Sequence, residues 1–136
     1  MADAAAIAAD MVEKVNKRDI EGFREMLHPD YTYQGAGGPV EKGVEAGVGV
    51  VVTFTTAFPD LKLTITNQYS DGDVSVVEFT ATGTHKAELQ GIPATGKSVT
   101  VNVADVVTVR DGKVLGEREY YDQLGMMQQL GVIPES

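Results

Sequence analysis

Residues 99–110, VTVNVADVVTVR, alternate between a face of valines and a face of smaller or polar side chains. A period of two over this length is typical of a β-strand with one buried side. Asp105 interrupts the valine face, where an unpaired carboxylate would cost on the order of several kcal/mol to bury. We therefore expect a raised pKa for Asp105, which suits a general acid or base. A buried salt bridge or a hydrogen bond to the backbone would explain the same pattern without catalysis.

The rest of the second half also has the pattern of strands. We predict three more strands, at residues 61–69, 74–85 and 113–121. Asp71-Gly72 and Asp111-Gly112 mark tight hairpin turns, because both dipeptides accept the backbone conformations that such turns require.

The first part of the chain is predicted to be helical. Residues 3–17 place apolar side chains on one face of a helix. Asp19 can cap a second, shorter helix, and Pro29 ends it at His28. A short strand is expected at residues 31–34.

Two further helical segments differ in how clearly the sequence defines them. Residues 43–58 have the length of a helix, but their glycines and β-branched residues have poor helix propensity. Residues 123–130 form a well-delimited helix that begins after Asp122 and stops at Gly131. Helices first and strands afterwards predict an α+β fold, with the helices on one face of an antiparallel sheet.

Length, charge and composition restrict the function. A chain of 136 residues is expected to form a single domain, residues 1–136. Its net charge of −9 argues against nucleic acid and anionic membranes as partners. With no cysteine, no signal peptide and no long apolar run, the expected location is the cytoplasm. Two distant histidines and no ligand-like spacing of acids predict no metal site.

Four strings of the chain, in order, resemble the SnoaL-like polyketide cyclase (ester cyclase) family. They are HPDY (28–31), AFPDLKLTI (57–65), TATGTHKAELQGIPATGKSV (80–99) and VRDGKVLGEREYYDQLGMMQQLG (109–131). The resemblance spans residues 5–131. It implies membership of the cone-shaped α+β superfamily of ketosteroid isomerase and nuclear transport factor two, a fold that hosts many chemistries.

The resemblance also implies an architecture and a type of reaction. A curved sheet wraps around an apolar pocket that helices roof, as in a cystatin-like cone. Characterised family members close a ring by intramolecular aldol condensation without metal or cofactor, and they assemble as dimers or larger oligomers. In the family an aspartate abstracts the proton from an activated carbon, and the alignment places this catalytic carboxylate at Glu119. This chain departs from the family with Gly116-Glu117-Arg118-Glu119 where relatives often read EHW(D/E), and with Asp105 where an active cyclase can carry a histidine.

The register of the hairpin at Asp111-Gly112 determines which side chains share the pocket. A two-residue loop would pair Asp105 with Arg118, giving a salt bridge and a lowered pKa. A three-residue loop would pair Asp105 with Glu117, so that Glu117, Glu119 and Tyr121 share its face. We favour the second register, in which like charges hold at least one proton near neutral pH.

Several other side chains are candidates for the pocket. His85 lies at a strand end, where it could orient a carboxylate or a substrate carbonyl, or simply bond the backbone. The Tyr31 and Tyr33 phenols face one way and could donate to an enolate, although core packing is the commoner role. Asn67 shares a strand face with leucines and an isoleucine, which makes it a plausible polar pocket group. Phe54 is expected to contact substrate, as are four more residues of the proposed pocket face: Tyr33, Asn67, Glu117 and Tyr121.

The leading hypothesis is a cofactor-free enzyme acting on a small apolar, carbonyl-bearing molecule. A carboxylate, Glu119 or Asp105, would remove a proton next to the carbonyl, with Tyr33, His85 or Asn67 stabilising the enolate. One alternative is a non-catalytic protein that binds a hydrophobic ligand. The other is a hydrolase resembling limonene epoxide hydrolase, for which Arg118 facing Asp105 would be the diagnostic feature.

Overall fold

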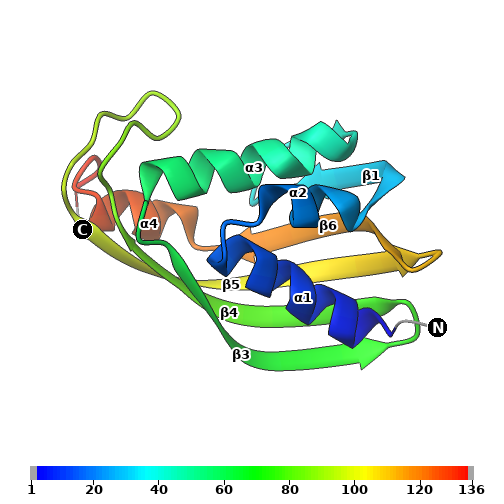
Figure 1. Cartoon of the computed structure of the whole chain (residues 1–136). Helices are drawn as coiled ribbons and strands as arrows, with labels where there is room; N and C mark the ends of the chain where they lie inside the picture. The colour runs from blue at the N-terminus through cyan, green and yellow to red at the C-terminus, as the bar shows by residue number, and fades with distance from the viewer. Residues whose placement is uncertain (1–2, 135–136) are drawn as a thin grey trace.

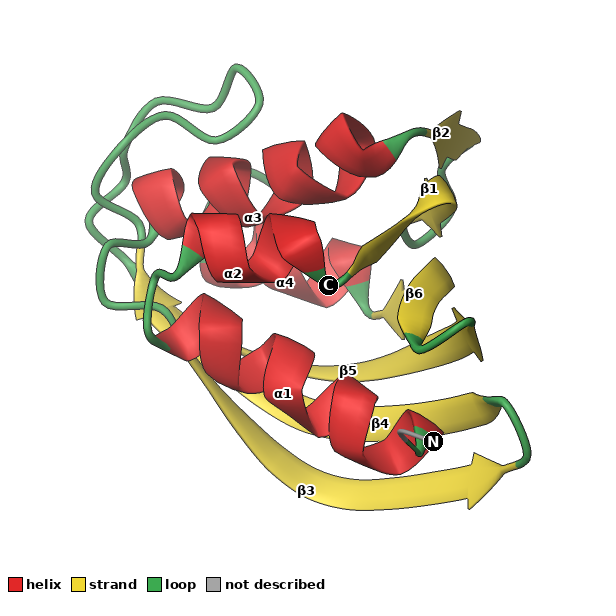
Figure 2. Ribbon diagram, turned by 45° about the vertical axis from the view of Figure 1, so that its right-hand side comes forward, coloured by secondary structure: helices red, strands yellow, loops and turns green. Residues whose placement is uncertain are grey.

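The computed structural model describes residues 3–134 as a curved six-stranded sheet with all four helices on its concave side (Figures 1 and 2). The helices are α1 (Ala4–Asn16), α2 (Ile20–Glu25), α3 (Val44–Ala57) and α4 (Gln123–Gln129). The strands are β1 (Leu27–Gln34), β2 (Val40–Lys42), β3 (Lys62–Asp71), β4 (Val74–Thr84), β5 (Ser98–Arg110) and β6 (Lys113–Tyr121). The predicted α+β class is confirmed.

The strands lie in the order β2-β1-β6-β5-β4-β3. All neighbouring pairs are antiparallel except β1 and β6, which run parallel. The sheet is therefore mixed, whereas the sequence predicted an antiparallel one. The parallel pair brings the early tyrosine-containing strand next to the acidic strand near the C-terminus, a contact that local sequence does not encode.

The helix boundaries follow from their capping residues. The Asp3 side chain accepts hydrogen bonds from the N–H groups of Ala5 and Ala6 at the start of α1. Asp19 and Asp122 cap α2 and α4 in the same way, through the N–H groups of Gly22 and Gly125. These caps satisfy backbone donors that a helix start leaves free, and the predicted starts are confirmed.

Helix α2 ends earlier than the sequence predicted. It stops at Glu25, and β1 begins at Leu27 instead of residue 31. Leu27 pairs with Val114, and the Val114 N–H donates to the Met26 carbonyl, so β6 draws this segment into the sheet. Pro29 lies where the β1–β6 register shifts, which avoids the loss of a ladder hydrogen bond.

The ambiguous segment 43–58 is a helix, because burial outweighs its poor propensity. Its buried face includes Gly47, Val48 and Val51, which lie over the sheet. Gly47 is needed for close approach, since a Cβ there would lie 2.6 Å from the Tyr31 ring. The short strand β2, which pairs with β1 just before this helix, has no counterpart in the prediction.

The β5–β6 hairpin adopts neither predicted register. Asp111 and Gly112, with φ of 55° and 74°, form a two-residue turn that pairs Arg110 with Lys113. A β-bulge at Leu115 then shifts the register by one residue, so Asp105 pairs with Glu119 and not with Arg118 or Glu117. The favoured three-residue loop is therefore wrong, but the acids do share one face.

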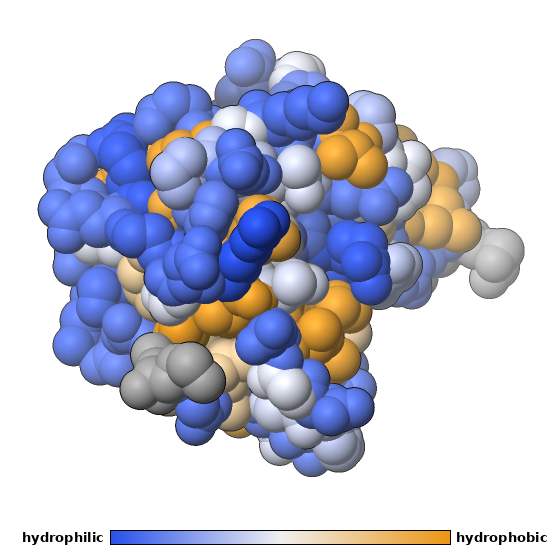
Figure 3. Space-filling model, turned by 90° about the vertical axis from the view of Figure 1, so that its right-hand side faces the viewer, coloured by the Kyte–Doolittle hydropathy of each residue, from blue (hydrophilic) through white to orange (hydrophobic). Residues whose placement is uncertain are grey.

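The described surface is largely polar. On the face seen in Figure 3, hydrophilic residues cover most of the area and apolar residues form separate patches. The apolar side chains of the core lie between the sheet and the helices, including the odd-numbered valines of β5. Within residues 3–134, no helix is long and apolar enough to cross a membrane.

Candidate active site

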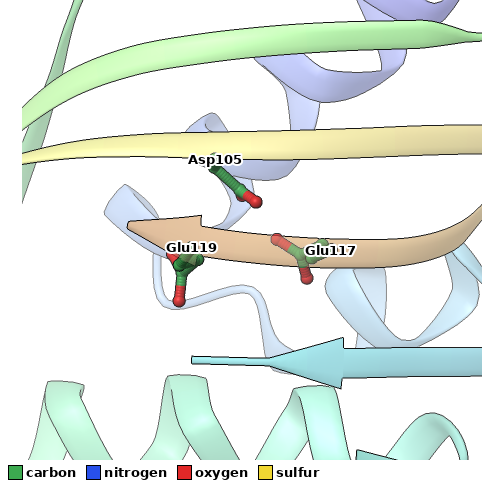
Figure 4. A group of neighbouring side chains, drawn as sticks. All are labelled: Asp105, Glu117 and Glu119. Atoms are coloured by element: carbon green, nitrogen blue, oxygen red, sulfur yellow. The ribbon is translucent and has the colours of Figure 1, made fainter. Parts of the chain in front are cut away.

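Three carboxyl groups meet on the concave face of the sheet (Figure 4). Asp105 reaches from β5 toward β6, which carries Glu117 and Glu119, and an oxygen of each lies within 4.8 Å of the others. Asp105 and Glu117 are 7% and 8% exposed, and Glu119 is half-buried. The strand alternation of β6 puts both glutamates on this face, while Arg118 between them points to the convex side.

Two tyrosines of β1 donate hydrogen bonds to these acids. The Tyr31 hydroxyl donates to Glu117 Oε2, and the Tyr33 hydroxyl donates to Glu119 Oε1 at 2.5 Å. Burial and the neighbouring carboxylates raise the pKa of both phenols, so they remain protonated donors. The parallel β1–β6 pair, with Tyr33 beside Glu117, holds both phenols against the acidic strand.

Burial and mutual repulsion keep protons on this cluster. Desolvation is the main cause of the raised pKa of Asp105, followed by the charge of Glu117 and a hydrogen bond to it. Desolvation and the charge of Glu117 raise the pKa of Glu119 to about 7, against a smaller lowering by the Tyr33 hydroxyl. In residues 3–134, no lysine, arginine or histidine forms an ion pair with any of the three acids.

Two adjoining cavities meet at Glu119. The outer one, about 130 Å³, is bounded mainly by α3, β4 and β5 and by the segment 58–63. Its lining is apolar except for Glu119 and Tyr121: Val15, Val50, Val51, Phe54, Phe58, Leu61, Leu63, Phe79, Ala81, Val99, Val101, Val103 and Met126. The inner one, about 60 Å³, is lined mostly by apolar residues of the helices, and its polar side chains are Asp105, Glu117, Glu119 and Tyr33. An apolar molecule in the outer cavity would therefore meet the Glu119 carboxyl.

Two predicted site residues lie elsewhere. Asn67 is exposed, because a bulge between Ile65 and Asn67 changes which residues of β3 face inward. Gln68 takes the inward position opposite Val77 and donates to the Ala5 carbonyl and to Ser75 Oγ. The assignment of Asn67 to the pocket is wrong.

His85 does not reach the carboxyl cluster. It follows Val77, the partner of Asp105, by eight residues, which is roughly 26 Å of strand. Its ring is fully buried against Phe58, and Nδ1 lies 3.0 Å from Thr95 Oγ1 and accepts from the Thr95 N–H. His85 therefore fastens the 86–97 connection to the core, so its predicted role toward a carboxylate or substrate is wrong and the alternative, a bond to the backbone, is confirmed.

The other candidates line the cavities. Phe54 and Tyr121 border the outer one, and Tyr33 and Glu117 border the inner one. The sequence indicated enolate binding or core packing for Tyr31, but its bond to Glu117 was not predicted. The alternation of Tyr31 and Tyr33 indicated that both phenols face one side of the strand. The parallel pairing of this strand with β6, which carries Glu117, could not be predicted from the sequence.

The carboxyl cluster is also an oxygen donor set of the kind that hard cations use. The sequence spacing gave no sign of it, since three acids on two strands become neighbours only through the sheet register. Glu117 and Glu119 each accept a tyrosine hydroxyl here. A cation would have to share or displace those bonds and release the protons that Asp105 and Glu119 hold.

The architecture defines a class: an α+β cone with an acidic group at the base of an apolar pocket. The model of the SnoaL-like polyketide cyclase family matches residues 6–130. The chain belongs to this family, and the predicted resemblance is confirmed.

Relatives with related names support the same family. The aklanonic acid methyl ester cyclase DnrD of Streptomyces peucetius is 29% identical over 89% of this chain and 86% of its own length. Among solved structures, IdmH of Streptomyces antibioticus, described as a proposed polyketide cyclase, is 28% identical with a TM-score of 0.81, over 94% of this chain and 98% of its own. A proposed polyketide cyclase of Acidithiobacillus ferrooxidans is 29% identical with a TM-score of 0.81, over 96% of each chain. These names support a cyclase-like activity, whereas assembly as a homodimer or larger homo-oligomer and the cytoplasmic location stay predictions.

Proposed function

We propose that this protein closes a ring in an apolar, carbonyl-bearing molecule by intramolecular aldol condensation, with Glu119 as the base. The observation that carries the proposal is the position of Glu119, which lines both cavities, so that its side chain would border an apolar ligand in the outer one. A pKa of about 7 suits a group that must take up and return a proton near neutral pH.

Each step conserves atoms and charge. The Glu119 carboxylate takes a proton from the carbon next to a carbonyl, and the C–H electron pair moves onto the carbonyl oxygen. The enolate carbon then attacks a second carbonyl of the same molecule and forms the C–C bond. The resulting alkoxide takes the proton back from the Glu119 carboxylic acid, which restores the base.

Glu119 is a better base than Asp105 on positional grounds. Asp105 borders only the inner cavity, and its Oδ1 is buried without a hydrogen-bond partner in the described residues. We assign Glu117 to the support of Glu119, because a charge on Glu117 raises the pKa of the base, and Asp105 lies directly opposite Glu119 on β5. The Tyr33 hydroxyl fixes the orientation of the Glu119 carboxyl.

Ring closure of aklanonic acid methyl ester, the compound named for the relatives, is the direct test. A simpler probe is 2-tetralone, whose activated hydrogens exchange with deuterium in D₂O when a base removes them. We expect the wild type to catalyse this exchange, and the exchange rate to fall by about 10²-fold or more in Glu119→Gln. Glu78→Gln changes an acid on the other face of the sheet and should match the wild type. Equal rates in Glu119→Gln and the wild type with both compounds would contradict the proposal.

The apolar outer cavity also suits a protein that only binds a hydrophobic ligand. In that case Glu119→Gln would bind 2-tetralone as the wild type does, and neither would catalyse exchange. Water activation by an Asp–Arg–Asp set receives no support, because Arg118 is exposed on the convex face and pairs with Val106.

A further inference from the structure

Tyr121 differs from the other two phenols at the site in having no bond to a carboxylate. Tyr31 and Tyr33 donate to Glu117 and Glu119. The Tyr121 hydroxyl forms no hydrogen bond with any residue of 3–134, and its side chain borders the outer cavity. It is therefore free to donate to a molecule that occupies this cavity.

The outer cavity offers few polar contacts. Glu119 and Tyr121 are its polar side chains among the described residues, and the tyrosine is the hydrogen-bond donor of the two when Glu119 acts as a base. A carbonyl oxygen bound in this cavity could accept a side-chain hydrogen bond from Tyr121. The donors that the sequence suggested, Tyr33, His85 and Asn67, do not line it, and the Tyr33 hydroxyl already donates to Glu119.

The two side chains are placed to act on neighbouring atoms. They lie two residues apart on one face of β6, opposite Asp105 and Val103, which separates their Cβ atoms by about 7 Å. A carbonyl carbon and its activated neighbour fit between two such side chains. Burial and the charge of Glu119 raise the pKa of Tyr121, so the phenol stays protonated beside the base.

We propose that Tyr121 donates a hydrogen bond to the carbonyl oxygen that becomes negative when Glu119 removes the neighbouring proton. This inference rests on the proposed function, since it names the group that stabilises the enolate formed there. The C–H bond breaks, its proton moves to Glu119, and its electron pair ends on the oxygen that faces Tyr121. The phenol keeps its own proton, so the only proton transfer is the one from the substrate to Glu119.

The test compares Tyr121→Phe with Tyr120→Phe, because these neighbours point to opposite faces. Tyr120 is 56% exposed on the convex side and serves as the matched control. For deuterium exchange into 2-tetralone, Tyr121→Phe should lower kcat about 10²-fold with KM changed less than about twofold. Its melting temperature and the pH midpoint of its rate should stay at the wild-type values, because the removed hydroxyl forms no hydrogen bond with residues 3–134 and Glu119 itself is unchanged.

A binding measurement checks the donor without turnover. In the Glu119→Gln background, which mimics the protonated base, bound 4-nitrophenol resembles the enolate when it ionises. Its pKa should fall on binding, and this fall should shrink in Glu119→Gln/Tyr121→Phe but not in Glu119→Gln/Tyr120→Phe.

The outcomes separate the two proposals. If Glu119→Gln exchanges deuterium at the wild-type rate, the proposed function is wrong. If Glu119→Gln is inactive, while Tyr121→Phe exchanges at the wild-type rate and Glu119→Gln/Tyr121→Phe lowers the pKa of bound 4-nitrophenol as much as Glu119→Gln does, the function stands and the role of Tyr121 is overturned.

Discussion

Asp105 on β5 lies directly opposite Glu119 on β6, although the two-residue turn between the strands would by itself place Arg118 there. The extra residue Leu115 accounts for the difference, because a bulge of one residue exchanges the two faces of everything that follows. Without this bulge, Arg118 would lie opposite Asp105 and would neutralise its charge. With it, carboxyl groups face one another in a space that holds no partner cation among the described residues.

The rate of deuterium exchange should rise with pH through about 7, as Glu119 loses its proton. Glu117→Gln should move this midpoint to lower pH, because the negative charge that raises the Glu119 pKa is gone. Tyr33→Phe should move it to higher pH, because the lost hydrogen bond favoured the carboxylate. Rate profiles between about pH 5 and 9 measure both shifts, and movement of both midpoints in the same direction would contradict this account.

Stability should fall as the pH rises from about 4 to 7. Asp105 and Glu119 have raised pKa values in the fold, so the folded state holds protons that the unfolded chain has lost. Their stabilising effect is complete below the ordinary values of 3.8 and 4.5 and is lost as the pH passes the folded values. For Glu119, the rise of the pKa from 4.5 to about 7 corresponds to about 3 kcal/mol of folding free energy that is lost above the folded pKa.

Asp105→Asn tests that dependence directly. The amide cannot ionise, so melting temperatures at neutral pH should equal or exceed those of the wild type, and their decline with pH should be shallower. The exposed turn variant Asp73→Asn should keep the wild-type slope. A steeper decline in Asp105→Asn than in the wild type would show that Asp105 is ionised in the fold.

Gly47→Ala should destabilise the protein by about 1–3 kcal/mol in urea unfolding, since its Cβ would lie 2.6–2.8 Å from atoms of Tyr31. The displaced phenol would also loosen its bond to Glu117. Gly49→Ala, in the same helix with open space around it, should stabilise by up to about 1 kcal/mol. Equal effects of the two substitutions would show that Tyr31 does not pack against this helix as described.

The turn that starts β6 depends on Gly112, whose φ is 74°. Gly112→Ala should lower the free energy of unfolding in urea by about 1 kcal/mol or more, because an L side chain is strained at this φ. Gly38→Ala provides the control, since its Cβ would make an ordinary contact of 3.7 Å with the Gly35 carbonyl. A neutral Gly112→Ala would argue against the two-residue turn.

Local sequence was enough for most elements but not for the contacts between them. The alternation of residues 99–110 predicted β5, the apolar period of residues 3–17 predicted α1, and Asp19 and Asp122 marked two further helix starts, because capping and period act over a few residues. The start of β1 at Leu27 was missed, since pairing with β6 overrides the helical pattern there. Asn67 was misplaced because its bulge depends on how β3 meets β4.

The sequence by itself determined that a carboxylate at residue 105 lies on a valine face, since that follows from a strand's period of two. It also determined the family, through strings that span most of the chain. Only the tertiary structure decided which groups surround that carboxylate, because the bulge at Leu115 and the parallel β1–β6 pair join residues that are far apart along the chain. Asp105 accordingly lies among two glutamates and two tyrosines, with Arg118 on the opposite face of the sheet.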